Sequence, residues 1–210
     1  MKLLEHYFSH NPHIKSELRT IKVRFNDLDL TFCSDNGVFS KDKIDFGSKT
    51  LIEELIKNCD YQFKSILDVG CGYGFMGISL AKKYNAKVDM VDVNERAIHL
   101  AKKNININKV EAKAFLSNIY ENVTDKYDLI ITNPPIRAGK QVVLTILKEA
   151  ALHLADEGEL WFVIRKDQGA KSVIKELENN YDCQIIAKNK GFYVIKSKKR
   201  WLLIAKLIKF

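Results

Sequence analysis

The sequence predicts an α/β fold, a doubly wound and mostly parallel sheet of seven strands with a terminal antiparallel hairpin. Between residues 65 and 180, short apolar segments alternate with segments whose apolar residues recur at helical spacing, the pattern of βαβ units. The short segments are almost continuously apolar, as expected when helices cover both faces of a sheet. The first of them runs directly into a glycine-rich turn that opens a helix, which is a further feature of such units.

Three regions are expected along the 210 residues. Residues 1–47 form an N-terminal extension of a helix and a hairpin, residues 48–197 form the sheet domain, and residues 198–210 form a basic and apolar tail. The tail includes RWLLIAKLIKF, whose pattern fits either an added strand or a helix with an apolar stripe.

Within the extension, residues 1–17 are polar and mixed and indicate a short helix followed by a loop. Residues 19–25 and 28–33 alternate between apolar and other side chains and are separated by a turn-forming pair, which predicts a hairpin. Residues 35–47 form a loop, and Ser48 is the expected N-cap of the next helix.

In the sheet domain, five parallel strands are expected to alternate with helices before a closing hairpin. The predicted parallel strands are residues 65–69, 87–91, 110–115, 127–132 and 159–164. The predicted helices are residues 51–56, 75–84, 94–105, 142–154 and 170–180. The predicted hairpin has its strands at residues 183–187 and 192–196.

The charge balance favours a polyanionic partner. Lys and Arg number 34 against 26 Asp and Glu, which gives a net charge of +8. No apolar run approaches the ~20 residues that span a bilayer, and the first residues lack the apolar stretch of a signal peptide. A cytoplasmic protein with no membrane contact is therefore expected.

The cysteines and histidines show no metal-ligand spacing, so no metal site is expected. Three histidines near the N-terminus lack an acidic or cysteine partner. The cysteines form no C-x-x-C pair and are expected to be free thiols in a reducing cytoplasm. They are Cys33, Cys59, Cys71 and Cys183.

The segment ILDVGCGYG, residues 66–74, predicts a ligand-binding turn between a strand and a helix. Gly70, Gly72 and Gly74 allow a tight turn and a close approach of the backbone to a ligand, and Cys71 lies in the same loop. The free N–H groups at the start of the helix favour a carboxylate or a phosphate. Three glycines at this spacing are weakly specific, and an ordinary strand-to-helix turn is the alternative.

Asp92 ends the second predicted strand, where a carboxylate accepts hydrogen bonds from ribose hydroxyls in nucleoside-binding α/β units. Dinucleotides and S-adenosylmethionine are the two candidate cofactors. Dinucleotide loops prefer G-x-G-x-x-G, whereas here Asp68 stands two residues before the first glycine. The pattern D-x-G-x-G-x-G resembles motif I of class I S-adenosylmethionine-dependent methyltransferases. It implies a Rossmann-like domain in which Asp68 and the glycine backbone lie along the methionine and ribose parts of the cofactor.

Asn133, Pro134 and Pro135 follow the fourth strand of the domain, at the carboxyl edge where such folds bind ligands. Pro134 favours an extended conformation for Asn133, and neither proline has an N–H group. The segment therefore presents two acceptors, the Asn133 side-chain oxygen and the Pro134 carbonyl. Acceptors that hold the hydrogens of an exocyclic amine direct the nitrogen lone pair toward a methyl sulfonium. Together with the glycine loop and Asp92, the segment resembles motif IV of amine-directed methyltransferases.

The residue after this motif bears on the identity of the target amine. Adenine-N6 and protein glutamine-N5 methyltransferases usually have an aromatic side chain there, which stacks on the planar target. This chain has Ile136, which disfavours both alternatives. An RNA-binding module that holds the cofactor without activity is a further alternative, which the intact Asn133-Pro134-Pro135 segment disfavours.

Over nearly its whole length the chain resembles the RsmC-like family of ribosomal RNA (guanine-N2) methyltransferases, which act on the small ribosomal subunit. Besides the glycine loop, the likeness lies in the segments HYFSHNP, GVFSKDKIDFG, SNIYE, NPPIRAGK and KGFYVIKS. It implies methylation of the N2 amine of a guanine in 16S ribosomal RNA. It also implies that Asn118 contacts the cofactor adenine and that Phe39 and Ser40 help to close the site. Larger members of the family have an additional N-terminal domain that these 210 residues do not contain.

Ile136, Arg137 and Lys140 are the expected contacts to the substrate RNA. The two cations can hold phosphates that flank the target base, which positions the RNA without reading its sequence. The alternative is that they form the solvated start of a helix. The sequence leaves open which nucleotide is modified, whether the substrate is naked RNA or the assembled subunit, and the oligomeric state.

Overall fold

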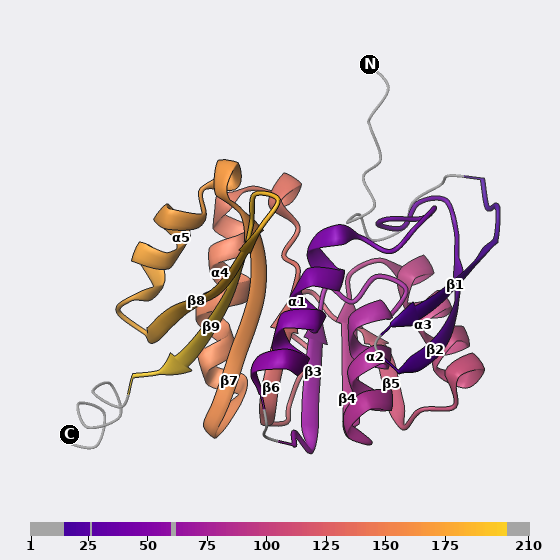
Figure 1. Ribbon diagram of the computed structural model, residues 1–210, viewed down its shortest axis with the longest axis horizontal. Helices are drawn as coiled ribbons and strands as arrows, with labels where there is room; N and C mark the ends of the chain where they lie inside the picture. The colour runs from indigo at the N-terminus through magenta and orange to yellow at the C-terminus, as the bar shows by residue number, and fades with distance from the viewer. Residues whose placement is uncertain (1–14, 26, 60–61, 201–210) are drawn as a thin grey trace.

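The structure, a computed structural model, describes residues 15–25, 27–59 and 62–200. The strands of its main sheet are β3 (Ser65–Val69), β4 (Lys87–Asp92), β5 (Ala112–Leu116), β6 (Tyr127–Thr132), β7 (Leu154–Arg165), β8 (Tyr181–Asn189) and β9 (Phe192–Lys199). They lie in the order β5-β4-β3-β6-β7-β9-β8. Neighbours from β5 to β7 are parallel, and β9 runs antiparallel to β7 and β8. The predicted fold class is confirmed (Figure 1).

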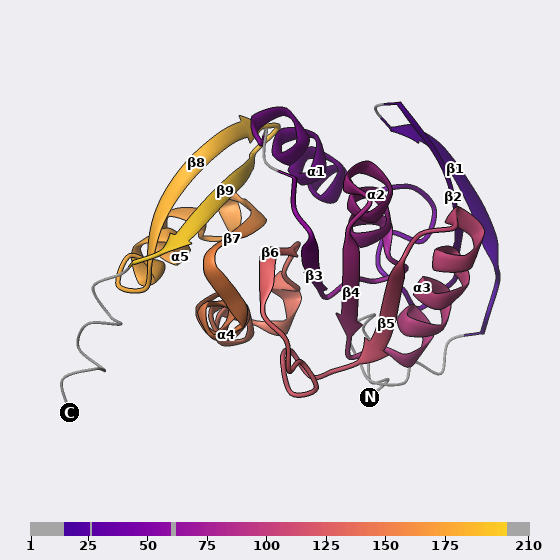
Figure 2. The same cartoon turned by 90° about the horizontal axis from the view of Figure 1, so that it is seen from below.

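Helices cover both faces of this sheet. They are α1 (Phe46–Asn58), α2 (Phe75–Tyr84), α3 (Glu95–Asn108), α4 (Lys140–His153) and α5 (Ala170–Leu177). The first three pack on one face and α4 and α5 on the other, so that two separate cores form (Figures 1 and 2). Ile66 and Leu67 of β3 belong to different cores, because successive side chains of a strand point to opposite faces.

A second, two-stranded sheet confirms the predicted N-terminal hairpin. Its strands are β1 (Arg19–Phe25) and β2 (Leu28–Ser34), which pair antiparallel. Two side-chain amides of α3 form hydrogen bonds with the backbone of β2. The Asn104 amide accepts the N–H of Cys33 at 2.7 Å and donates to its carbonyl at 2.9 Å. The Asn108 amide does the same with Thr31, at 3.0 and 2.8 Å. Two buried amides thus replace a neighbouring strand along β2, and the hairpin lies against α3 (Figure 1).

The start of α1 differs from the prediction, since the N-cap is Asp45 and not Ser48. The Asp45 Oδ2 atom accepts a hydrogen bond from the Ser48 backbone N–H at 2.7 Å. A carboxylate at this position also interacts favourably with the helix dipole. Ser48 is therefore the third residue of the helix, and the expected boundary between residues 47 and 48 falls within the first turn.

Other boundaries shift by a few residues. β7 begins at Leu154, earlier than the predicted residue 159, since Leu154 already pairs with Tyr127 of β6; the register between the two strands shifts before Leu129. β8 and β9 are longer than predicted and α5 is shorter. Residues 15–18 have no regular structure, and the rest of the predicted N-terminal helix and residues 201–210 of the tail lie outside the described residues.

Two further observations concern the expected absence of membrane and disulfide features. No helix in the described ranges is long and apolar enough to cross a bilayer. The four cysteines lie in the described part of the chain, and no disulfide joins any of them.

Candidate functional site at the carboxyl edge of the sheet

A cavity of about 600 Å³ opens at the carboxyl edge of the sheet. Val69 of β3 pairs with Thr132 of β6, so the loops that follow these strands start side by side. Asp92 of β4 pairs with Leu116 of β5, which brings two more loops to the same edge. The predicted site residues that line the cavity are Phe39, Ser40, Gly70, Gly72, Asp92, Asn118, Asn133, Pro134, Pro135, Ile136 and Arg137.

The glycine loop forms the floor of this cavity. The N–H groups of Gly70 and Cys71 both donate to the carbonyl of Val91, at 2.9 and 3.0 Å, and fix the loop on β4. Gly70 and Gly72 have φ values of +73° and +55°, and a Cβ on either would meet no atom within 4 Å. The left-handed backbone therefore favours glycine at both positions, and the space above both residues is open to a ligand.

The carboxylate of Asp92 closes the loop from the other side. Its Oδ2 atom accepts the N–H of Gly72 at 2.9 Å, and its Oδ1 atom accepts the N–H of Asn94 at 2.9 Å. Burial raises the pKa of Asp92, and these backbone hydrogen bonds act in the opposite direction. Each carboxylate oxygen has further lone-pair capacity, so the group can accept a vicinal diol from the cavity.

Asp68, which the sequence placed along the ligand, lies beneath the loop and does not line the cavity. Its Oδ2 atom accepts the N–H of Gly77 at 2.8 Å, while its Oδ1 atom has no hydrogen-bond partner among the described residues. Burial, with a contribution from the charge of Asp92, raises the pKa of Asp68 to about 7. Gly77 permits this approach, because a Cβ there would lie only 3.2 Å from Asp68 Oδ2, and 2.7 Å from the sulfur of Met90.

The raised pKa of Asp68 should make the free energy of unfolding depend on pH. The native protein retains a proton that the unfolded chain releases from about pH 4, so stability from this group is lost as the pH rises from about 4 to about 7. Asp68→Asn does not titrate. The stability of this variant relative to the wild type should therefore increase from pH 5 to pH 8, by at most ~3 kcal/mol in unfolding free energy, and its Tm relative to the wild type should rise accordingly. A difference in Tm that is the same at both pH values would contradict the assignment.

Two other predicted residues are also displaced from the main cavity. Gly74 caps α2 with φ +93°, and a Cβ there would lie 3.0 Å from the Ile78 side chain. The Cys71 thiol is buried and faces a smaller hollow of about 30 Å³ beside the main cavity, and burial raises its pKa. Both residues shape the loop rather than the ligand-facing wall.

Asn133 lines the cavity together with the glycine loop, and two hydrogen bonds hold its side-chain amide nitrogen. Its Nδ2 atom donates one hydrogen bond to Asp45 Oδ2 and another to Ser48 Oγ, each at 2.9 Å. Within the described part of the chain, the Asn133 Oδ1 atom has no donor. Thr132 Oγ1 donates to the carbonyl of Val69 at 2.8 Å and anchors the strand end that precedes Asn133. The sequence alone did not indicate Asp45 and Ser48 as partners of this residue.

The residues beyond Pro135 separate into two groups. Ile136 and Arg137 form a 3-10 turn at the cavity mouth, where Ile136 is half-buried and Arg137 is exposed. Lys140 instead begins α4 and turns toward α5, where its Nζ atom lies 3.1 Å from Ser172 Oγ and 3.5 Å from a carboxylate oxygen of Glu176.

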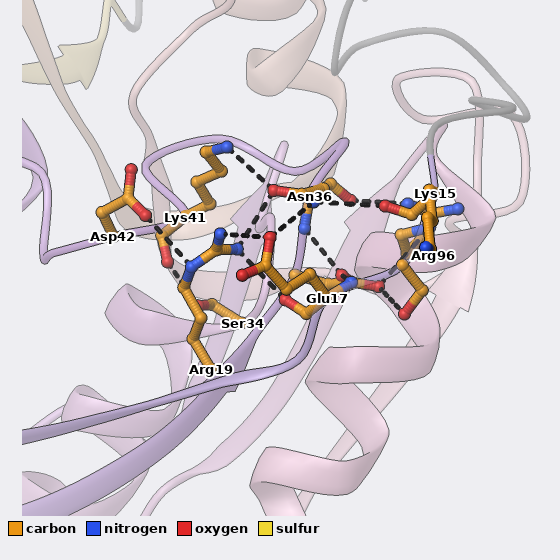
Figure 3. A network of polar contacts seen from close by, with 10 residues as sticks. Lys15, Glu17, Arg19, Ser34, Asn36, Lys41, Asp42 and Arg96 are labelled. Atoms are coloured by element: carbon orange, nitrogen blue, oxygen red, sulfur yellow. Dashed lines mark hydrogen bonds and ion pairs between the residues drawn. The ribbon is translucent and has the colours of Figure 1, made fainter.

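A polar network holds the loop that carries Phe39 and Ser40 over the cavity (Figure 3). Asn36 lies at its centre: its Oδ1 atom accepts from Lys41 Nζ at 2.8 Å and from an Arg19 N–H at 3.0 Å. The carbonyl of Asn36 accepts from Arg96 of α3 at 2.6 Å. These hydrogen bonds connect the loop to both the hairpin and α3, and no pattern within the loop sequence predicts them.

The far wall of the cavity consists of residues that sequence reasoning missed. Arg165, Gln168 and Phe192 come from the end of β7, the turn after it and the start of β9. The Arg165 guanidinium lies 5.4 Å from the centre of the Phe192 ring, and Asp167 binds its Nε and terminal N–H groups at 3.0 and 2.9 Å. The only sequence feature that pointed to this wall was the segment KGFYVIKS, which contains Phe192.

Among the described residues, no group of three or more His, Cys, Asp or Glu side chains is placed to hold a metal ion. The polar groups that line the cavity instead suit an organic ligand: a half-buried carboxylate, a side-chain amide oxygen and an open glycine backbone.

Known proteins resemble the chain over most of its length. The methyltransferase small domain family matches residues 29–196. Uncharacterized protein YbxB of Bacillus subtilis is 46% identical over 200 residues, which cover 93% of this chain and 98% of that protein. Ribosomal RNA small subunit methyltransferase C of Buchnera aphidicola is 38% identical over 172 residues, which cover 80% of this chain but 49% of that protein. The same-named protein of Psychromonas ingrahamii is 32% identical, with 71% of this chain and 43% of that protein covered.

The chain thus spans half or less of these two methyltransferase C relatives. Among solved structures, the 16S rRNA N2 methyltransferase RsmC of T. thermophilus, in complex with AdoMet and guanosine, superimposes with a TM-score of 0.80 at 27% identity. The match covers 90% of this chain and 52% of RsmC. A ribosomal protein L11 methylase of Lactobacillus delbrueckii has a TM-score of 0.65 at 18% identity, a likeness of fold.

Proposed function

The chain belongs to the methyltransferase small domain family, and on that premise we propose that it methylates the N2 amine of a guanine in 16S ribosomal RNA. The methyl donor is S-adenosylmethionine, whose sulfonium supplies an activated methyl group when it is bound. The partner is ribosomal RNA or the small ribosomal subunit, and the site of action is the cytoplasm. The methyltransferase C relatives and the RsmC structure support this substrate class.

The orientation of Asn133 is the observation that supports the proposal most directly. Both hydrogens of its amide nitrogen are engaged, by Asp45 and Ser48, so the oxygen is the atom left to face the cavity. Pro134 and Pro135 add no N–H groups to this wall. The wall therefore presents acceptors to a group that carries two N–H donors, as the exocyclic amine of guanine does.

The cavity floor fits a nucleoside cofactor. Asp92 is positioned to accept the ribose hydroxyls, and Gly70 and Gly72 leave room for the chain of atoms beyond the ribose. In this proposal Asn118, which lines the cavity from the loop after β5, contacts the adenine. Phe39 and Ser40 also line the cavity, and in this proposal they help to close it over the cofactor.

Catalysis by these residues rests on position and not on a strong base. Hydrogen bonds from the amine to the Asn133 oxygen and the Pro134 carbonyl fix the nitrogen and orient its lone pair toward the methyl donor. The methylated nitrogen then carries a positive charge and loses a proton to water readily, because deprotonation restores a lone pair that is delocalised into the base. Positioning of two reactants supplies roughly 7–11 kcal/mol in well-oriented reactions.

The surface around the cavity suits an RNA substrate. The chain has a net charge of +8, and Arg137 is exposed at the cavity mouth, where it can hold a phosphate beside the target nucleotide. Ile136 provides an apolar contact at the same mouth. Lys140 is paired with Glu176, so its contribution to phosphate binding requires that this exposed ion pair open.

The test is methyl transfer from labelled S-adenosylmethionine to small ribosomal subunits that lack the modification, and separately to naked 16S ribosomal RNA. We expect label in RNA, and N2-methylguanosine as the modified nucleoside identified by mass spectrometry. N6-methyladenosine as the product, or label in protein glutamine, would establish the alternative with the same N-P-P chemistry. The absence of transfer to both substrates would overturn the proposal.

A further inference from the structure

We propose that Asp45 and Ser48 are positioning residues of the methyl-transfer reaction, which act by locking the Asn133 amide with its oxygen toward the target amine. The inference rests on the proposed function, because it concerns the same reacting amine. It assigns a role to the first turn of α1, a segment that precedes Asn133 by more than 80 residues in the sequence.

The lock consists of three hydrogen bonds around one carboxylate oxygen and one hydroxyl. Asp45 Oδ2 accepts both the Ser48 backbone N–H at 2.7 Å and the Asn133 amide at 2.9 Å. Ser48 Oγ accepts the second amide hydrogen of Asn133, also at 2.9 Å. Two acceptors thus hold the two hydrogens of one amide, and both acceptors belong to the same helical turn.

The lock determines which end of the amide faces the cavity. In the flipped orientation the Asn133 oxygen would face the Asp45 carboxylate, and its two N–H groups would point at the amine hydrogens of the target. Both contacts would be repulsive, since an ionised carboxylate accepts hydrogen bonds only and the amine presents donors. Asp45 therefore excludes the orientation in which Asn133 cannot act as an acceptor.

The same carboxylate also serves as the N-cap of α1, which makes the arrangement rigid. Gly47 lies between the cap and Ser48, and a Cβ there would come within 2.8 Å of the Phe192 ring and 3.1 Å of Asp45 Oδ2. The first turn of α1 is thus packed between the site and β9. The capping and locking roles share one oxygen, so they must be separated by the choice of variant.

Four substitutions separate the two roles. Asp45→Ser keeps a good N-cap but is one atom too short to reach Asn133. Asp45→Asn keeps one oxygen that can accept both hydrogen bonds. Ser48→Ala removes the second acceptor, and Thr50→Val is its matched control, because it deletes a buried hydroxyl of the same helix that has no partner among the described residues.

We expect Asp45→Ser and Ser48→Ala each to lower the single-turnover rate by about tenfold or more, with cofactor affinity unchanged. Asp45→Asn should recover most of the wild-type rate, and Thr50→Val should match the wild type. The thermal unfolding of Asp45→Ser should stay close to that of Asp45→Asn, which shows that the cap is intact. Wild-type turnover in Asp45→Ser would overturn the proposal.

A paired exchange provides a sharper test. Asn133→Asp alone places two carboxylates in contact, and we expect it to be the less active variant. Asp45→Asn combined with Asn133→Asp restores a donor facing an acceptor and leaves an acceptor oxygen toward the amine. The donor then stands where the oxygen that caps α1 lies in the wild type, so thermal unfolding is compared in both variants and the rates are compared only where both are folded. The double variant should therefore be more active than Asn133→Asp alone, a positive coupling that independent roles would not produce. Additive losses would overturn the proposal.

A measurement without substrate separates this proposal from the proposed function. In the wild type the two Asn133 side-chain amide protons should exchange slowly with solvent in NMR spectra, and Asp45→Ser should accelerate their exchange. Fast exchange in the wild type would overturn the lock even if the protein methylates guanine. Slow exchange that Asp45→Ser abolishes would support the lock even if the product were a different methylated amine.

Discussion

Asn133→Ala should lower the single-turnover rate of methyl transfer by roughly 10²-fold or more and leave cofactor affinity close to that of the wild type. The substitution removes the oxygen that accepts one hydrogen of the target amine. It leaves Pro134, Pro135 and the glycine loop in place, and Asn133 makes no hydrogen bond to the loop or to Asp92 in the described part of the chain. An interaction made mainly in the transition state affects the rate far more than binding.

The measurement is single-turnover methylation of small-subunit RNA, with cofactor affinity from calorimetry on the same preparations. Asn58→Ala is the matched control, since it removes an exposed amide at the far end of α1 whose side chain, among the described residues, bonds only to Glu54. A wild-type rate in Asn133→Ala would refute the role of its oxygen. A loss of cofactor affinity equal to the loss of rate would show that Asn133 acts through the cofactor and not through the amine.

Asp92→Ala should weaken cofactor binding by 1–3 kcal/mol, about 5- to 150-fold in Kd, because it strands the ribose hydroxyls without an acceptor. The same change also frees the N–H groups of Gly72 and Asn94, which the carboxylate binds at 2.9 Å. Part of any loss could therefore arise from a looser glycine loop. The experiment must separate the ribose contact from this structural effect.

A thermodynamic cycle with two ligands makes that separation. S-adenosylhomocysteine and its analogue without the 2′-hydroxyl are titrated into the wild type and into Asp92→Ala. The wild type should discriminate strongly between the two ligands, and the variant should bind them almost equally. Undiminished discrimination in the variant would show that Asp92 supports the loop and does not contact the ribose.

The local elements of this protein were predictable because their signals lie within a few residues. β3, α2 and β6 occupy the residues that hydrophobic patterning predicts, and α3 begins after Asn94 as its capping side chain indicates. Parallel strands place their carboxyl ends at one edge. The order of elements therefore also predicted that the glycine loop, Asp92 and Asn133 would meet.

The burial of a side chain and the direction in which it points could not be predicted in the same way. Asp68 belongs to the glycine motif, yet it is buried and accepts the N–H of Gly77, because it lies two residues after Ile66 in β3 and therefore points to the face that α2 covers. Lys140 is close to Asn133 in sequence, yet it faces Glu176, because it stands on the first turn of α4 where that helix meets α5. Sequence proximity fixes neither burial nor the direction of a side chain.

The sequence by itself determined the fold class and the position of the glycine loop, Asp92 and Asn133 at one edge of the sheet, and it predicts an acceptor role for Asn133-Pro134-Pro135. Only the tertiary structure decided that Asp45 and Ser48 hold the Asn133 amide, that Asn36 anchors the loop over the cavity, and that Arg165 and Phe192 form its far wall. The physical reason is that hydrophobic periodicity and turn residues act over short stretches of chain, whereas these contacts join segments far apart in the sequence. Their partners are set by how α1, α3 and β9 pack around the sheet, and no local pattern specifies that packing.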